Sequence, residues 1–538
     1  MSANEFTRFL HSHLERVQPL LREVNLAYWN ATISGDAADF ERSAELQVAL
    51  QRVYADRGEF ESIRRWRDDP PSAEETDRRQ IDVLYRAYAR NQVDPSLNER
   101  ITKLQSKIEN LFNVFRASID GKEVTSNDIR TILKDSRDSI LRRKAWEASK
   151  QVGAVVRDDM LTLVRLRNEA ARSLGYDNYY SMSMALAEQN EEEVVRLFGE
   201  LEAFTCEPFR AMKDEVDAQL ASRFGIAPSD IRPWHYEDPF FQEAPRVCDV
   251  ALDTYYANVE ILDLVRRFFN GIGLEVDEIL SRSDLYEKPG KDQHAFCTDI
   301  DRSGDIRILA NIKNDEMWTG TMLHELGHAV HDRYIDPGLP FLLRQEAHIF
   351  TTEAIAMLFG RLSKDPNWIE DMTGISESER ERIDADLARN LRLHMVIFAR
   401  WSQVMLHFER ELYNEPEQDL NRRWWDIVRE HQMLTPPEDQ DFPHWASKTH
   451  IVSAPVYYHN YLLGELLASQ LGHRIRTHVL PPGAAPSLCG HAEVGSYLKE
   501  QFFAPGARYR WDELIRKATG EELSPRYFVR EFVDGSHG

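Results

Sequence analysis

The chain has 538 residues, with 66 Lys plus Arg against 90 Asp plus Glu, and a formal net charge of −24 at pH 7. This charge argues against nucleic acid and anionic membrane surfaces as main partners, because both would repel it. A mean hydropathy of −0.51 and the lack of an apolar run near the roughly 20 residues that a bilayer requires predict no transmembrane helix. The first residues lack the basic and then apolar layout of a secretory signal, so we expect a cytoplasmic protein.

The cysteines support the same compartment. Cys206, Cys248, Cys297 and Cys489 form no CxxC pair, so we expect neither a disulfide framework nor a cysteine zinc site.

The amino-terminal part of the chain is typical of long helices. Apolar residues recur at steps of three and four, and Ser96 with Glu99 has the spacing of a capping box before one such run. The expected helices cover residues 5–30, 38–67, 95–119, 136–175 and 192–223. A segment rich in proline and aromatic residues follows at 228–245, so we expect residues 1–240 to form one helical half and residues 241–538 a second, catalytic half.

One β-hairpin is expected in the second half. Ile306, Ile308, Ala310 and Ile312 alternate after the turn at 301–304, and the strand 294–300 leads into that turn. The overall prediction is therefore a mostly α fold with a small hairpin.

The segment that follows the hairpin carries the clearest chemical signal. His324 and His328 in the sequence HELGH are four residues apart, so on a helix both imidazoles lie on one face and can bind the same zinc ion. Glu325 between them can take a proton from a water molecule that the metal activates, and can pass it to the leaving amine. This pattern predicts one zinc ion per chain.

A third ligand is expected 25 residues beyond the second histidine. Glu353 lies on another predicted helix, and three protein ligands plus water form the usual catalytic zinc site. A glutamate near a helix start is also commonly a solvated residue that the helix dipole favours, so the spacing alone leaves both readings open.

These motifs resemble the gluzincin metallopeptidases, in particular the angiotensin-converting enzyme (peptidyl-dipeptidase A) family, with features of the thimet oligopeptidases and oligoendopeptidase F. Leu339-Pro340-Phe341-Leu342-Leu343-Arg344 followed by Thr352-Glu353-Ala354-Ile355 is similar to the LPxxLR and HEAIGD motifs of the converting enzymes, whose glutamate is the third zinc ligand. The resemblance implies a deep cleft between two helical halves, with the hairpin beside the zinc helix.

The same resemblance implies residues that bind substrate. His294 and Ala295 match the edge strand that pairs with the substrate backbone, and Lys448 matches a lysine that holds the substrate's C-terminal carboxylate. His450 matches a histidine that hydrogen-bonds the carbonyl of the scissile region.

A tyrosine-rich segment follows. Tyr461 shares a helix face with Tyr458 or with Tyr457, and a phenol backed by His450 suits stabilisation of a tetrahedral oxyanion. We assign that role to Tyr461 and Tyr458, and leave open which of the three tyrosines faces the zinc, since tyrosines on a helix also serve as core residues.

Two departures from the converting enzymes concern the orientation of a zinc ligand and the expected dipeptide-releasing specificity. Met357 replaces the aspartate that orients a zinc-binding histidine, and the glutamine that helps to hold a substrate C-terminus is expected to be replaced near residues 234–236.

The sequence therefore predicts a zinc-dependent peptidase that acts on oligopeptides, without nucleic-acid or membrane partners. The alternatives are a peptidyl-dipeptidase that releases C-terminal dipeptides and a non-catalytic peptide-binding relative. The oligomeric state does not follow from the sequence.

Overall fold

A computed structural model describes residues 3–246, 250–484 and 487–535. The α-helices of these residues are α1 (Ala3–Ser34), α2 (Ala37–Tyr54), α3 (Arg57–Asp68), α4 (Glu75–Ala89), α5 (Pro95–Val114), α6 (Ser126–Asp135), α7 (Ser139–Ser173), α8 (Tyr179–Leu186), α9 (Glu191–Phe224), α10 (Asp253–Tyr256), α11 (Ile261–Gly271), α12 (Asp277–Arg282), α13 (Glu316–Arg333), α14 (Ile349–Gly360), α15 (Pro366–Thr373), α16 (Glu377–Asn414), α17 (Leu420–Gln432), α18 (His450–Ser453), α19 (His459–Arg474), α20 (Ala492–Leu498), α21 (Trp511–Thr519) and α22 (Arg526–Phe532). The strands are β1 (Ala117–Ile119), β2 (Lys122–Val124), β3 (Phe296–Asp299) and β4 (Ile306–Leu309). The prediction of a mostly α fold is confirmed.

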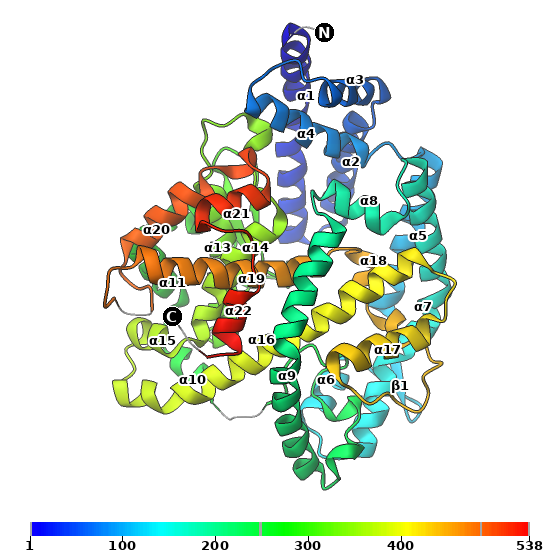
Figure 1. Cartoon of the computed structure of the whole chain (residues 1–538), viewed down its shortest axis with the longest axis vertical. Helices are drawn as coiled ribbons and strands as arrows, with labels where there is room; N and C mark the ends of the chain where they lie inside the picture. The colour runs from blue at the N-terminus through cyan, green and yellow to red at the C-terminus, as the bar shows by residue number, and fades with distance from the viewer. Residues whose placement is uncertain (1–2, 247–249, 485–486, 536–538) are drawn as a thin grey trace.

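Long helices set the shape of the molecule. Helices α1 to α4 lie together at one end, and α9 and α16 cross the middle (Figure 1). α16 packs against α9, α17 and α19, while α18 packs against α5 of the amino-terminal part. The division of the chain near residue 240 stays a prediction, and contacts such as that between α5 and α18 join residues from both sides of it.

Helix starts follow local capping chemistry. The expected capping box of Ser96 and Glu99 is wrong, because the Asp94 carboxylate accepts the N–H groups of Ser96 and Leu97, and Pro95 is the first helical residue. The expected helix 38–67 is two helices, because the side chain of Asp56 caps a new helix by accepting the N–H of Glu59.

Two antiparallel hairpins interrupt the helices. β1 pairs with β2, and the turn between them is Asp120-Gly121, both with positive φ. The residues of β1 were expected to form the end of the helix 95–119. The hairpin expected in the second half is confirmed as β3 and β4, with Phe296 opposite Leu309 and Asp299 opposite Ile306. Within the described residues β3 pairs with β4 alone, so no strand occupies its other edge.

The amino-terminal helix is tied to the far end of β3. The side-chain amide of Asn25 on α1 donates to the carbonyl oxygens of Asp299 and Ile300, each at 3.1 Å. The backbones of Gly35 and Gly290 approach so closely that a Cβ on Gly35 would lie 2.2 Å from the Gly290 oxygen. Helix α1 therefore holds the hairpin from outside.

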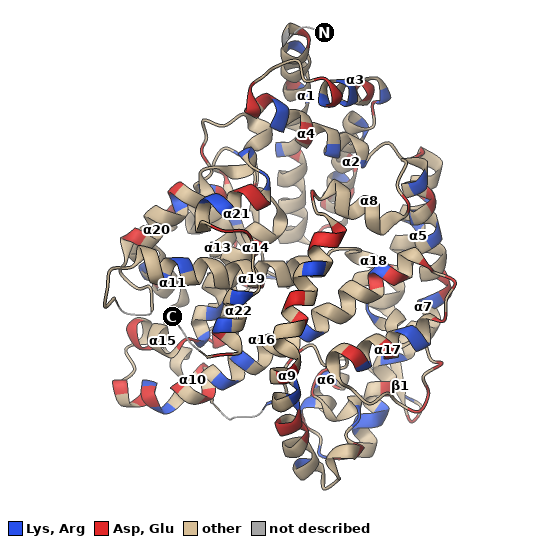
Figure 2. Cartoon of the chain, viewed as in Figure 1, with Lys and Arg blue, Asp and Glu red and all other residues tan. Residues whose placement is uncertain are grey.

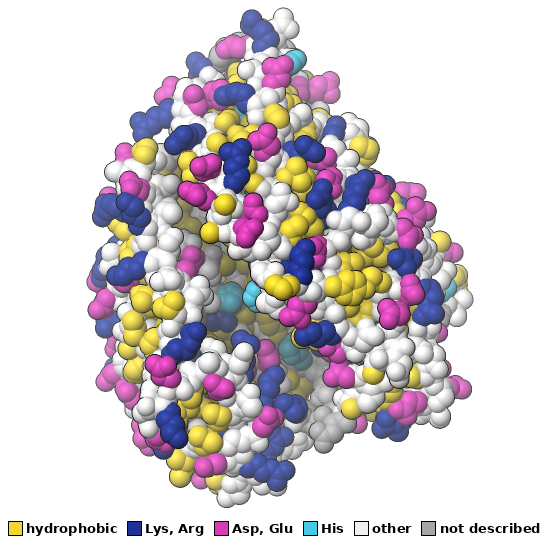
Figure 3. All heavy atoms as spheres, turned by 180° about the vertical axis from the view of Figure 1, so that it is seen from behind, with side chains coloured by type: hydrophobic (Ala, Val, Ile, Leu, Met, Phe, Trp, Pro, Cys, Tyr) yellow, Lys and Arg dark blue, Asp and Glu magenta, His cyan; other side chains and the backbone are white. Residues whose placement is uncertain are grey.

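Acidic and basic residues are interspersed along the helices (Figure 2). On the opposite face the molecule is hollowed, with histidine side chains visible in the hollow (Figure 3). In the described ranges no helix has the length and apolarity needed to cross a bilayer. Cys206, Cys297 and Cys489 are free thiols, and Cys248 lies outside the described residues.

Candidate active site

Two helices carry the three expected zinc ligands. The Asp315 carboxylate caps α13 by accepting the N–H of Trp318 at 2.8 Å, and this helix presents His324 and His328 one turn apart. Helix α14 starts at Ile349 and presents Glu353 toward them.

The three ligand atoms form a compact triangle. His324 Nε2 lies 3.3 Å from His328 Nε2, and Glu353 Oε2 lies 3.8 and 3.9 Å from the two nitrogens. Ligands held about 2.0–2.2 Å from one zinc ion in tetrahedral geometry span a triangle of this size. Among the described residues, this is the one group of three or more His, Cys, Asp or Glu whose ligand atoms are close enough to hold a metal. The residues present therefore fit zinc.

Thr352 orients one of the histidines. The Nδ1 atom of His328 lies 2.8 Å from the Thr352 hydroxyl oxygen, which leaves Nε2 facing the other two ligands. Thr352 thus does for His328 what an acidic partner does in many zinc sites, although Met357 replaces the aspartate of the converting enzymes. Thr352 was not predicted from the sequence, although its place directly before Glu353 was a usable signal.

Two glycines allow α14 to lie between α13 and α19. A Cβ on Gly327 of α13 would lie 2.7 Å from the Cα of Ala356, and one on Gly464 of α19 would lie 3.3 Å from the Cβ of Glu353. The close approach of these helices places Glu353 beside the two histidines.

Glu325 lies beside the triangle and is 7% exposed. Its carboxylate accepts a hydrogen bond from the backbone N–H of Cys297 on β3. Burial raises the pKa of Glu325 to about 8, and the neighbouring charge of Glu353 adds to this shift. A bound cation opposes both effects by stabilising the charged form. The expected base and the edge strand are therefore in direct contact.

The three tyrosines and His450 form a chain of aromatic contacts. The ring centroid of Tyr458 lies 5.3 Å from that of His450 and 5.4 Å from that of Tyr461, and Tyr461 lies 5.2 Å from Tyr457. Tyr457 hydrogen-bonds the Glu353 carboxylate. The Tyr458 hydroxyl instead accepts the indole N–H of Trp401 at 2.7 Å, and so turns away from that ligand.

Lys448 lies in a separate aromatic recess. Its ammonium donates to the side-chain oxygen of Gln242 at 2.8 Å and lies about 5 Å from the rings of Trp401 and Tyr458. Burial lowers the pKa of Lys448 to about 8. The expectation that the glutamine is replaced near residues 234–236 is wrong, because Gln242 occupies this place. The irregular segment around it has no periodicity that would have located it.

The two remaining substrate-binding candidates, His294 and Ala295, lie just before β3. His294 is exposed, and its backbone N–H donates to the Asp292 carboxylate at 2.9 Å. They extend β3 at its amino-terminal end, and Cys297 of this strand contacts Glu325.

Known proteins match this chain over most of its length. Residues 132–534 match the family described as peptidase family M3. The chain belongs to peptidase family M3. Residues 1–209 match the family described as angiotensin-converting enzyme. These matches confirm the resemblance to the gluzincin metallopeptidases, and they agree with the prediction of a zinc metallopeptidase.

Individual relatives are more distant. Carboxypeptidase 1 of Bacillus subtilis (strain 168) is 26% identical over 273 residues, which cover 44% of this chain and 51% of the relative. Thermostable carboxypeptidase 1 of Pyrococcus furiosus is 23% identical over 271 residues, with the same coverage of 44% and 51%. The chain thus spans about half the length of the curated relatives it matches.

Proposed function

We propose that this chain is a zinc-dependent peptidase that hydrolyses oligopeptides. The observation that carries the proposal is the triangle formed by His324, His328 and Glu353, with the Glu325 carboxylate beside it. A zinc ion in this triangle would polarise a scissile carbonyl and lower the pKa of a water molecule toward 7.

The protein residues supply the remaining steps. The peptide adds as a strand to the edge of β3 that lies away from β4, near His294 and Ala295. The Glu325 carboxylate removes a proton from the attacking water and delivers it to the amine nitrogen as the C–N bond breaks. His450 and Tyr461 donate hydrogen bonds to the oxyanion.

We further propose that Lys448 binds the free C-terminal carboxylate of the substrate. No carboxylate of the described residues lies within ion-pair distance of its ammonium, and Gln242 and Tyr458 flank it. An ammonium buried in this way favours an incoming anion. We therefore assign Tyr458 to this anchor and not to the oxyanion. This anchor favours cleavage close to the C-terminus over cleavage at internal bonds, and two relatives bear the name carboxypeptidase.

Metal analysis together with one conservative variant tests the catalytic proposal. We expect one zinc per chain in the purified protein and in Glu325→Gln, whereas turnover of a mixed peptide library falls by several orders of magnitude in the variant. Removal of zinc with a chelator should abolish turnover, and its return should restore it. Masses of the products will distinguish release of one residue from release of a dipeptide.

The rival function is a non-catalytic peptide receptor on the same fold. It predicts bound zinc and bound peptide without turnover in the unmodified protein. Full activity of Glu325→Gln would instead overturn the role of this carboxylate while leaving the enzyme proposal in place.

A further inference from the structure

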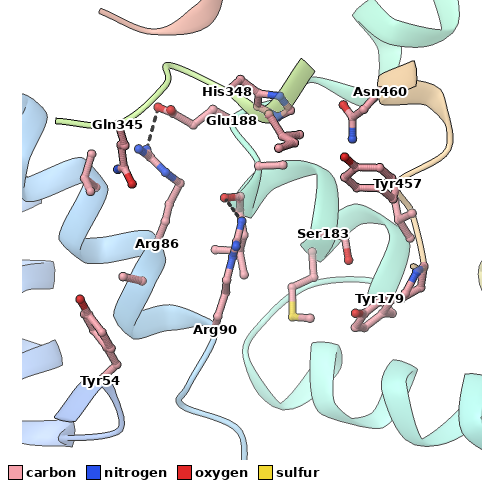
Figure 4. Close-up of a pocket in the computed structure, with 18 of the residues that line it drawn as sticks. Tyr54, Arg86, Arg90, Tyr179, Ser183, Glu188, Gln345, His348, Tyr457 and Asn460 are labelled. Carbon is pink, nitrogen blue, oxygen red and sulfur yellow. Dashed lines mark hydrogen bonds and ion pairs between the residues drawn. The ribbon is translucent and has the colours of Figure 1, made fainter. Parts of the chain in front are cut away.

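A large cavity lies beside the zinc triangle and takes no part in the proposed chemistry. It has a volume of about 800 Å³ and is walled by α4, α5, α7, α8 and the segment 342–349 that leads into α14 (Figure 4). Tyr457 forms its boundary with the metal site, because this tyrosine lines the cavity and hydrogen-bonds Glu353.

The cavity is separate from the carboxylate anchor. Lys448, Gln242 and Tyr458 are not among its lining residues. The consecutive residues Tyr457 and Tyr458 point to different regions, the first to Glu353 and the cavity, the second to Trp401 and the anchor. A peptide whose C-terminus lies at Lys448 and whose scissile bond lies at the zinc site therefore extends its amino-terminal residues toward the cavity.

The charges that line the cavity are mostly positive, although the whole chain carries −24. The arginines and glutamates of the lining number five and two, namely Arg79, Arg86, Arg90, Arg167, Arg302, Glu188 and Glu346. This imbalance favours an anionic ligand.

One glutamate serves two of the arginines. Glu188 pairs with Arg79 through two contacts of 2.5 and 2.8 Å, and with Arg86 at 2.7 Å. Arg167 bonds neutral groups, which include the carbonyl oxygens of Ile451 and Val452. The arginines that line the cavity thus outnumber the carboxylates that line it.

Arg90 is the most exposed residue among these arginines. It is the one cavity arginine that is more than a third exposed, and it donates to the carbonyl oxygen of Leu186 at 2.8 Å. Within the described part of the chain, no carboxylate lies within 4.0 Å of it. A guanidinium has five N–H donors, so Arg90 retains donors for a ligand.

The surroundings of Arg90 suit a small anion such as a carboxylate. Arg86 lies four residues earlier and also projects into the cavity, and Tyr179 and Ser183 line the opposite wall (Figure 4). Burial lowers the pKa of Arg86 to about 10, so both arginines are charged at neutral pH.

We propose that this cavity binds an acidic side chain of the substrate on the amino-terminal side of the scissile bond, with Arg90 as the residue that selects Asp or Glu. The proposal rests on the proposed function, which fixes the direction of the peptide. Arginine recognises a carboxylate through two parallel hydrogen bonds. The neutral amide of a substrate glutamine cannot accept both of them.

Matched peptides test the proposal. A quenched fluorescent peptide with a free C-terminus is made with Gln at every position before the cleaved bond, and Glu replaces Gln at one position at a time. We expect the unmodified enzyme to prefer Glu at one position by about tenfold in kcat/KM at low salt, with the difference mainly in KM, and the preference should shrink as salt is added. Arg90→Gln should bring the ratio of kcat/KM for the Glu and Gln peptides to about one. Arg90→Lys should retain part of the preference for Glu.

Arg78→Gln is the matched control. Arg78 lies on the same helix, is exposed and does not line the cavity, so this variant should keep the ratio of the unmodified enzyme. Thermal unfolding of both variants separates loss of charge from loss of fold. A charge reversal, Arg90→Glu, should favour Lys over Gln at the same position.

A Glu to Gln ratio of kcat/KM near one at every position in the unmodified enzyme would overturn the proposal. An unchanged ratio in Arg90→Gln would also overturn it. Failure of the proposed function is recognised separately, because it abolishes hydrolysis of the Gln peptide as well. In that case binding of the same peptides, measured by fluorescence anisotropy, still reports the preference for Glu, and equal affinities would refute it.

Discussion

At the scale of single residues, Thr352 contacts the metal ligand His328 but is not itself a ligand. A variant at this position therefore tests the orientation of the ligand while all three ligands stay in place. Thr352→Val keeps the shape of the side chain but removes the oxygen that lies 2.8 Å from His328 Nδ1. Loss of such a partner typically weakens metal affinity by about 10–100-fold, so we expect this loss in zinc affinity with little change in thermal stability. Competition with a chelator measures it.

Thr321→Val provides the control for this variant. Thr321 lies on the helix of the two histidines, is half-buried, and its hydroxyl donates to the backbone oxygen of Met317. Its zinc affinity should equal that of the unmodified protein. Equal affinities for Thr352→Val and Thr321→Val would mean that Thr352 does not orient His328.

Lys448 gives the proposed anchor a pH dependence. Burial lowers its pKa to about 8, so the ammonium is charged below that pH and neutral above it. For a peptide with a free C-terminus, kcat/KM should therefore fall above about pH 8. The same peptide with an amidated C-terminus should be cleaved more slowly and lack this fall, and the ratio of the two rates cancels every pH effect they share. A ratio that stays constant with pH, or equal cleavage of both peptides, would exclude the anchor.

The sequence located the residues of the site that lie close together in the chain. His324, Glu325 and His328 follow from helix periodicity, and Glu353 follows from one motif. Gln242 was missed because its contact with Lys448 spans 206 residues of chain. The opposite orientations of Tyr457 and Tyr458 depend on the start of α19 at His459, which periodicity fixes only to within a few residues.

At the scale of elements, the close crossing of α13 and α14 is what brings the ligands together. In Gly327→Ala the new Cβ would meet the backbone of Ala356 at 2.7 Å, so the two helices must separate. We expect a loss of about 1–3 kcal/mol in the free energy of unfolding. Zinc affinity should fall too, because Glu353 moves with α14.

Gly199→Ala is the control for this crossing. Gly199 lies within α9, and a Cβ there would have no atom within 4 Å. Alanine at an open helical position is more stable than glycine by about 0.5–1 kcal/mol, so this variant should gain stability and keep its zinc affinity. Denaturant unfolding of the two variants should thus give changes of opposite sign, and a gain in both would mean that the crossing is not tight.

The elements also show where sequence patterns reach their limit. Apolar periodicity predicted the long helices α1, α7 and α9 with small errors at their ends. The first hairpin was missed, because its strands have three residues each and follow a strong helical pattern. The turn Asp120-Gly121 was a usable signal, since this pair favours tight hairpin turns with positive φ at both residues.

At the scale of the whole molecule, helix α1 supports the strand that we expect to bind substrate. Asn25→Ala removes two hydrogen bonds to the end of β3 and should cost about 1 kcal/mol locally. Hydrogen exchange in α1 and β3 should become faster, and KM should rise more than kcat falls. Asn30→Ala, at an exposed position of the same helix, should change neither. Unchanged exchange in β3 of Asn25→Ala would show that α1 does not stabilise the strand.

The link between Asn25 and β3 also bears on the synthesis of the protein. The two residues that accept its hydrogen bonds, Asp299 and Ile300, lie 274 and 275 residues after Asn25 in the chain. At a translation rate of about 5–20 residues per second, α1 leaves the ribosome on the order of tens of seconds before its partner strand. During this interval the apolar face of α1 has only its neighbours α2 to α4 to pack against. Until the hairpin arrives, α1 therefore packs within that small helical unit, and the supported strand forms only late in synthesis.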